Sequence, residues 1–169
     1  MIIRAVLLLF AALVVLAPGA DADEPRPPLS GMKQDSSAPL GVSADTLTVD
    51  QTTGTAVFTG SVIITQGDLK LSTDRAEVRY AAGEAGKPGK IERLIATGNV
   101  LLVTPTEAAE AEMAYYLVPT SLIVLTGNVV LTQSGSVLAG QKVTMNLTDG
   151  TAQAEGRVST TLQTGTTLP

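Results

Sequence analysis

The 169-residue sequence contains no cysteine, histidine or tryptophan, and only 3% of its residues are aromatic. The absence of cysteine and histidine excludes thiolate nucleophiles, disulfide bonds, Cys/His zinc sites and catalytic triads that use an imidazole. Charged residues amount to 16%, against roughly 25% in an average globular domain. The net charge of −5 has the wrong sign for non-specific binding to nucleic acid. We therefore expect neither an enzyme nor a nucleic-acid-binding protein, although chemistry that needs only carboxylates stays open.

The first 22 residues have the pattern of a secretory signal peptide. Arg4 precedes an uncharged apolar run from Ala5 to Ala17, and the small residues that follow end in the cleavage motif Ala20-Asp21-Ala22. The apolar run has 13 residues, fewer than the ~20 that a membrane-spanning helix needs. We expect cleavage after Ala22, with Ala17 as the second choice, and export of the mature chain from the cytoplasm.

Residues 23–40 contain four prolines and little that a folded core could bury. This composition favours a disordered linker. We place the folded domain at residues 41–163 and a short disordered tail at 164–169.

A Gly-x-Val signal occurs four times, with spacings of 38, 29 and 29 residues, at Gly60, Gly98, Gly127 and Gly156. The first spacing exceeds the others by nine residues, which is the length of the Gly/Pro-rich stretch 81–89. We therefore expect that stretch to be an inserted surface loop. A second landmark precedes each glycine by 15 residues once the insert is subtracted, at Asp45, Asp74, Glu112 and Gln141. The two landmarks predict a structural repeat of about 29 residues.

Apolar side chains alternate with polar ones on both sides of each glycine, as in β-strands with one buried face. Residues 107–117 have helix propensity, but the repeat places Glu112 and Ala114 where Asp74 and Ala76 lie, so we expect a strand there too. The pattern predicts fourteen or fifteen short antiparallel strands in an elongated sandwich or jelly roll. The two end strands of such a stack would let further copies join head to tail.

Three segments together resemble a known family: Ala44–Asp50, Gly54–Val62 and Leu125–Gln133. They are similar to the OstA-like (organic solvent tolerance) domain of the LptA family of lipopolysaccharide transport proteins. The resemblance implies a V-shaped β-jelly roll in the periplasm that binds the lipid A acyl chains in its apolar interior. It also implies end-to-end association that connects LptC of the inner-membrane LptB/LptF/LptG complex with LptD/LptE at the outer membrane.

A carrier of this kind must bury acyl chains continuously, because a chain of roughly twelve to fourteen carbons gains about 10 kcal/mol from burial. We expect its lining to be the inward-facing apolar residues, for which core packing is the alternative role. These residues are Phe58, Val62, Ile64, Val78, Leu94, Val100, Leu102, Tyr116, Leu125, Val129, Leu131, Val143 and Met145.

The charged residues offer two further candidate sites, and for both we prefer a structural role. Asp45, Asp74 and Glu112 follow the repeat, and the fourth member of the series is neutral Gln141, so we expect turn capping at strand ends rather than catalysis or calcium binding. The basic residues of the N-terminal half would suit lipid phosphates, but a solvated strand face is the preferred interpretation. They are Lys70, Arg75, Arg79, Lys90 and Arg93.

The sequence thus predicts a non-enzymatic lipopolysaccharide carrier that needs no metal and no cofactor. Two alternatives stay open: a structural β-filament with a dry, fully packed interior, and a membrane-anchored component resembling LptC. An N-terminal fragment of an LptD-type barrel is disfavoured.

Overall fold

The computed structural model describes residues 32, 35, 37–83 and 89–163. The expected signal peptide with its cleavage site at Ala22, most of the linker and the tail lie outside the described residues. Within the described part the chain forms ten strands and one 3₁₀ turn, so the prediction of an all-β protein is confirmed. The elements are β1 (Leu40–Ser43), β2 (Thr46–Asp50), β3 (Thr55–Gln66), β4 (Leu69–Tyr80), β5 (Ile91–Val103), β6 (Glu107–Leu117), η1 (Val118–Thr120), β7 (Leu122–Gln133), β8 (Ser136–Asn146), β9 (Thr151–Glu155) and β10 (Ser159–Thr161).

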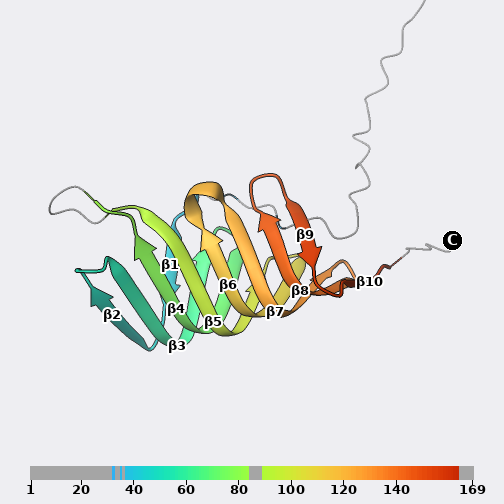
Figure 1. Cartoon of the computed structure of the whole chain (residues 1–169), viewed down its shortest axis with the longest axis horizontal. Coiled ribbons are helices and arrows are strands. Elements are labelled where there is room, and N and C mark those ends of the chain that lie inside the picture. Colours follow the sequence, from blue (N-terminus) through green and yellow to red (C-terminus); the bar gives the residue numbers. More distant parts are fainter. Residues whose placement is uncertain (1–31, 33–34, 36, 84–88, 164–169) are drawn as a thin grey trace, which may run out of the picture.

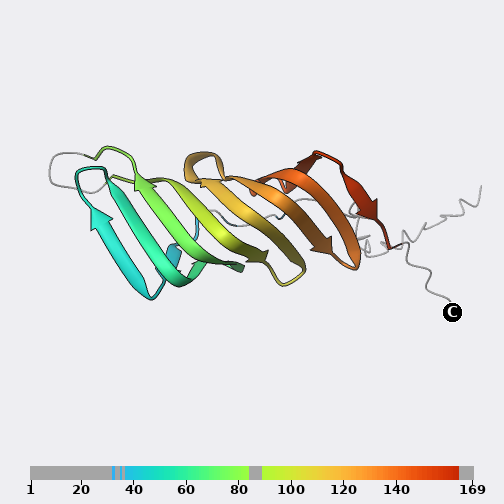
Figure 2. The same ribbon diagram turned by 60° about the horizontal axis from the view of Figure 1, so that its bottom comes forward.

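All ten strands belong to one antiparallel sheet in which sequence neighbours pair in order from β3 to β8. At one end both β1 and β2 pair with β3, and at the other both β9 and β10 pair with β8. Figures 1 and 2 show the result, an elongated ribbon of hairpins with β2 near one tip and β9 and β10 near the other. Residues 107–117 form the strand β6, as expected despite their helix propensity. The insert 81–89 lies between the end of β4 and the start of β5.

The six long strands bend in the middle instead of ending there. In β5, Gly98 and Asn99 have φ values of 83° and 45°, and in β7 Gly127 and Asn128 have 83° and 46°. Two successive left-handed residues insert a bulge, and the strand register shifts there, between Thr97 and Val100 in β5. Our prediction of fourteen or fifteen short strands was wrong, because many of the segments counted as separate strands are halves of continuous bent ones.

The bends divide the sheet into two half-sheets that face each other across the interior. The first half-sheet consists of β2, β9 and residues 55–59, 75–80, 91–97, 113–117, 122–126 and 142–146. The second half-sheet consists of β1, β10 and residues 62–66, 69–73, 100–103, 107–110, 129–133 and 136–140. This arrangement gives the V-shaped section of a β-jelly roll, with the bend at its corner.

Carboxylates from neighbouring strands pack against the glycines at the corner. Asp74 of β4 accepts a hydrogen bond from Nδ2 of Asn99 at 2.8 Å, and a Cβ added to Gly98 would lie 2.5 Å from its Oδ2. Glu112 of β6 accepts the corresponding bond from Nδ2 of Asn128 at 2.7 Å. The expectation that these acids cap strand ends is wrong for Asp74 and Glu112, which lie mid-strand. They accept hydrogen bonds from the asparagine side chains of the bend.

The segment before the predicted domain boundary contributes to the interior. β1 begins at Leu40, which packs against the core, and the Met32 side chain is fully buried. The described part of residues 23–40 therefore contacts the sheet, although we expected a disordered linker throughout this range.

The corner geometry predicts that Gly98→Ala destabilises the fold by about 2 to 4 kcal/mol, the sum of a left-handed φ and a steric clash with Asp74. Gly54→Ala is the matched control, because Gly54 has a φ of 63° but its nearest neighbour would be 3.5 Å from the new Cβ. We expect this control to cost only about 1 to 2 kcal/mol.

Chemical denaturation of the two single variants and of Gly98→Ala in an Asp74→Ala background measures both contributions. The clash disappears in that background, so Gly98→Ala should then cost no more than the control. An unchanged cost would refute the role assigned to the carboxylate.

Candidate functional site

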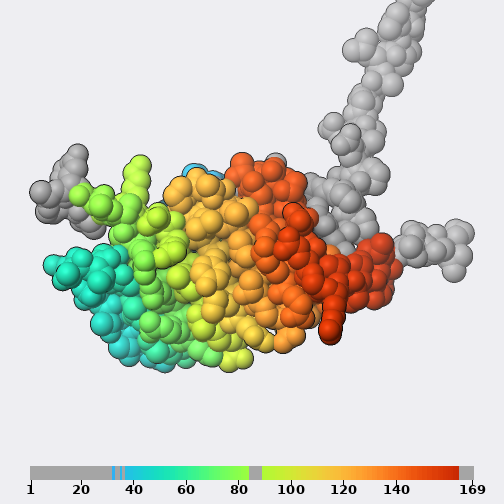
Figure 3. All heavy atoms as spheres, viewed as in Figure 1, coloured from blue at the N-terminus to red at the C-terminus, as the bar shows by residue number. Residues whose placement is uncertain are grey.

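The candidate site is the apolar interior between the half-sheets. Of the thirteen predicted lining residues, all but Phe58 are buried in one continuous cluster, and Phe58 is partly buried against the same cluster near the β2 end. On the face seen in Figure 3, the atoms of β3 to β8 form a continuous surface over this interior.

The inward-facing residues form apolar rows that cross the strands along the length of the molecule. One row of the first half-sheet passes from β2 to β9 through directly paired residues, namely Leu47, Phe58, Ala76, Ala96, Ala114, Leu125, Val143 and Ala154. A facing row of the second half-sheet consists of Val42, Ile64, Leu71, Leu102, Ala109, Leu131 and Leu138. No polar residue interrupts the first row between β2 and β9 or the second row between β1 and β8, and Thr160 follows Leu138 in β10.

Several interior residues were absent from our predicted lining. Leu69, Leu71, Ile123 and Leu147 are buried, and the alternation that pointed to Leu125 also applies to Ile123. The buried alanines Ala76, Ala96 and Ala114 were missed because small side chains give a weak hydrophobic signal. They are directly paired with one another across β4, β5 and β6, next to the bend.

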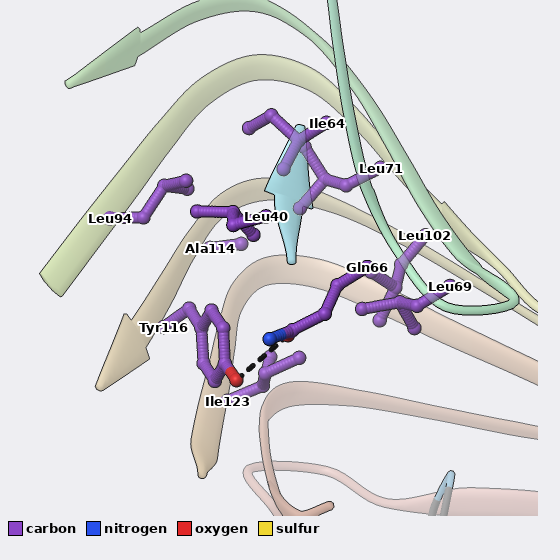
Figure 4. Close-up of a pocket in the computed structure, with 10 residues that line it drawn as sticks. All are labelled: Leu40, Ile64, Gln66, Leu69, Leu71, Leu94, Leu102, Ala114, Tyr116 and Ile123. Atoms are coloured by element: carbon purple, nitrogen blue, oxygen red, sulfur yellow. Dashed lines mark hydrogen bonds between the residues drawn. The ribbon is translucent and has the colours of Figure 1, made fainter. Parts of the chain in front are cut away.

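Between its two ends, the interior is nearly filled by the side chains of the protein. A cavity of about 20 Å³ remains, lined by apolar residues of both half-sheets and by Gln66. Figure 4 shows its walls, which include Leu40, Leu71, Leu94 and Leu102. A space of this size holds about one water molecule. This cavity is too small for an acyl chain.

A buried polar pair crosses the interior at this cavity. The Tyr116 hydroxyl donates to Oε1 of Gln66 at 2.9 Å, and Nε2 of Gln66 donates to the Ala38 carbonyl at 3.0 Å. Burial raises the pKa of Tyr116 above its ordinary value of 10.0, and the hydrogen bond to Gln66 offsets part of this effect. Tyr116 is therefore a neutral hydrogen-bond donor at physiological pH. The alternation of apolar and polar residues identified Tyr116 as inward-facing. It did not identify Gln66, because a polar residue is not expected at an inward position.

The basic residues of the N-terminal half lie away from the interior. Arg79 is directly opposite Arg93 across β4 and β5, and both alternate with inward-facing apolar residues. The Arg79 guanidinium forms an ion pair with Glu77 at 3.1 Å, and both side chains are partly exposed. Arg75, Arg79 and Arg93 form part of the outer, partly exposed face of the first half-sheet, whereas Lys70 lies in the second half-sheet.

Both ends of the sheet expose large apolar side chains. On β2, Leu47 and Val49 are 53% and 59% exposed although they face inward by register, because no further strand follows in the described part of the chain. At the opposite end Val158 and Leu162 are 47% and 50% exposed. The apolar interior thus reaches solvent at its two ends.

The described residues contain no cluster of three or more acidic, histidine or cysteine residues with which to hold a metal ion. Among them there is also no helix with the length and hydrophobicity to cross a membrane.

Comparison with known proteins connects this arrangement to a family. The family model of the LptA/(LptD N-terminal domain) LPS transport protein matches residues 41–151. The lipopolysaccharide export system protein LptA of Escherichia coli K12 is 30% identical over 135 residues, which cover 75% of this chain and 70% of that protein. LptA of Haemophilus influenzae is 24% identical over 162 residues, covering 92% and 90% of the two chains.

A solved structure shares the fold. The crystal structure of LptH, the LptA-homologous periplasmic component of the lipopolysaccharide transport device of Pseudomonas aeruginosa, superimposes with a TM-score of 0.68. The two chains are 20% identical, and the match covers 76% of this chain and 98% of the LptH chain. The predicted β-jelly roll is confirmed. The chain belongs to the LptA/(LptD N-terminal domain) family of lipopolysaccharide transport proteins.

Proposed function

We propose that this protein is a non-enzymatic periplasmic carrier that shields the acyl chains of lipopolysaccharide between its half-sheets on the way to the outer membrane. The observation that carries the proposal is the pair of uninterrupted apolar rows running from one end of the sheet towards the other. Acyl chains need continuous burial, at about 0.8 kcal/mol per CH₂ group, and these rows offer it along the whole molecule.

The closed interior is compatible with a carrier that opens for its ligand. Side chains of the two half-sheets fill each other's space when no lipid is bound, and acyl chains replace those contacts when the half-sheets part. The thirteen predicted lining residues have the position for this role, since they all lie in or against the interior cluster. The sugar and phosphate groups of the lipid remain outside in water.

The exposed ends support a bridge assembled from jelly rolls. In the proposed arrangement the end strands of neighbouring copies pair head to tail, and the outermost ends meet LptC of the inner-membrane LptB/LptF/LptG complex and LptD/LptE at the outer membrane. The outer edge of β2 pairs with no other strand of the described residues, and Leu47 and Val49 are exposed on it; both features favour such strand addition. Export by the predicted signal peptide would deliver the chain to this place.

We predict that a photo-crosslinking amino acid at Leu131 captures lipopolysaccharide in cells, because Leu131 is 1% exposed and faces the interior. The matched control is Leu101, a leucine of the same half-sheet that faces outward and is 37% exposed. The readout is a lipopolysaccharide adduct detected on immunoblots after irradiation. Capture from Leu101 alone, or adducts of equal yield at both positions, would favour a structural filament with a packed interior.

We predict that Val49→Asp weakens self-association at least about tenfold, because a carboxylate would be buried where the next copy extends the apolar row. Thr48→Asp is the control, since Thr48 lies on the same exposed strand but faces outward. Sedimentation velocity over a range of protein concentrations measures the effect. Equal weakening by both variants would indicate simple charge repulsion and contradict pairing in the proposed register.

A further inference from the structure

The Tyr116–Gln66 hydrogen bond joins the two half-sheets on the side opposite the corner. Gln66 is the last residue of β3, five residues beyond Ser61 at the bend, and Tyr116 is four residues beyond Glu112. At a rise of about 3.3 Å per residue, both lie about 13 to 17 Å from the bend. They lie in opposite half-sheets, yet their side chains meet at 2.9 Å. The bond therefore spans the mouth of the V.

The same point also holds the N-terminal segment. Gln66 donates its amide to the Ala38 carbonyl, two residues before β1 begins, and Leu40 of β1 lines the cavity beside the pair. Figure 4 shows the Tyr116 hydroxyl pointing at the Gln66 amide with Leu40 close by. One glutamine thus connects the first half-sheet, the second half-sheet and the start of the folded domain.

A buried polar pair is costly to separate when no nearby side chain can replace its hydrogen bond. The neighbouring residues Leu69, Leu94, Leu102 and Ile123 offer no hydrogen-bonding side chain. Separating Tyr116 from Gln66 without a replacement partner would leave the Tyr116 hydroxyl unsatisfied in an apolar environment. The closed state is held until water reaches this hydroxyl.

We propose that Tyr116 and Gln66 form a latch that closes the mouth of the jelly roll, and that lipid acyl chains enter where this latch opens. The inference rests on the proposed carrier function and assigns its entry site and its gating residues. In the closed state the pair bonds internally, and in the open state water bonds to the Tyr116 hydroxyl instead.

The first test compares Tyr116→Phe with Tyr115→Phe. Tyr116→Phe removes only the latch hydroxyl, which weakens the closed state and should tighten the apparent affinity for fluorescently labelled lipopolysaccharide about 2- to 10-fold. Tyr115 is the matched control, because it lies on the next position of β6 and faces outward between Ile95 and Val124. We expect this control to bind like the wild type. Unchanged or weaker binding by Tyr116→Phe would overturn the latch.

The second test crosslinks the two half-sheets at the mouth. The chain contains no cysteine, so Gln66→Cys with Tyr116→Cys introduces a unique pair that a thiol-specific crosslinker bridges. A direct disulfide is unsuited, since the native side chains between the two backbones exceed its reach. We expect the bridged protein to lose lipopolysaccharide binding and to regain it when the crosslinker is cleaved by a reductant. Tyr115→Cys with Val124→Cys, a pair within the first half-sheet, should bind whether bridged or not.

The outcomes separate the latch from the function on which it rests. A wild-type protein that fails to bind lipopolysaccharide would overturn both. A wild type that binds, together with a bridged Gln66→Cys/Tyr116→Cys protein that binds equally well, would overturn the latch alone. Circular dichroism establishes that each variant is folded, and the Tyr116→Phe arm decides the matter if the double-cysteine variant does not fold.

Discussion

The bend in the long strands is the feature on which the rest of this structure depends. A flat antiparallel sheet of this length would bury nothing on either face. Because a glycine and the residue after it adopt left-handed φ values in mid-strand, the strand turns and its two halves face each other. The carboxylate of the neighbouring strand then fills the space above the glycine, so a side chain at Gly98 would collide with Asp74. A single sheet becomes two half-sheets with a common interior and without a break in the hydrogen-bond ladder on either side.

Folding one sheet onto itself produces an interior whose filling can be exchanged. At the corner the chain itself connects the half-sheets, whereas at the mouth only side-chain contacts hold them together. Opening at the mouth therefore leaves the strand pairing intact. An open, empty interior would expose apolar surface at about 25 cal/mol per Å². The interior therefore closes on its own side chains when no lipid is present. In the proposed carrier, a bound acyl chain would gain its own burial but displace these contacts, which would reduce the net affinity and favour release to the next copy.

The alternation of apolar and polar residues predicted which side chains of nearly every strand face the interior. It did not predict that the long strands continue through the bend. Alternation identified Leu94, Leu125 and Met145 correctly, because burial on one face of a strand requires a period of two. The number of strands was overestimated, since a Gly-Asn pair commonly ends a strand or forms a turn and here it bends one. Gln66 escaped prediction because its inward position depends on a partner 50 residues away in the sequence. Nor does sequence alone indicate that Met32 reaches the core from within a proline-rich segment.

The bent sheet also explains why the ends of the molecule remain uncovered. Each hairpin buries its inward face against its neighbours and the opposite half-sheet. Within the described part of the chain, however, the last strand at each end has a neighbour on one side only. Leu47 and Val49 occupy the same rows as Phe58 and Ala56, so they face inward at a place where the interior meets solvent. A further strand that pairs with β2 in antiparallel register would extend both rows without interruption. The same geometry that shelters a lipid within one copy would therefore carry a continuous apolar path across the junction to the next, provided that the bends of the two copies align.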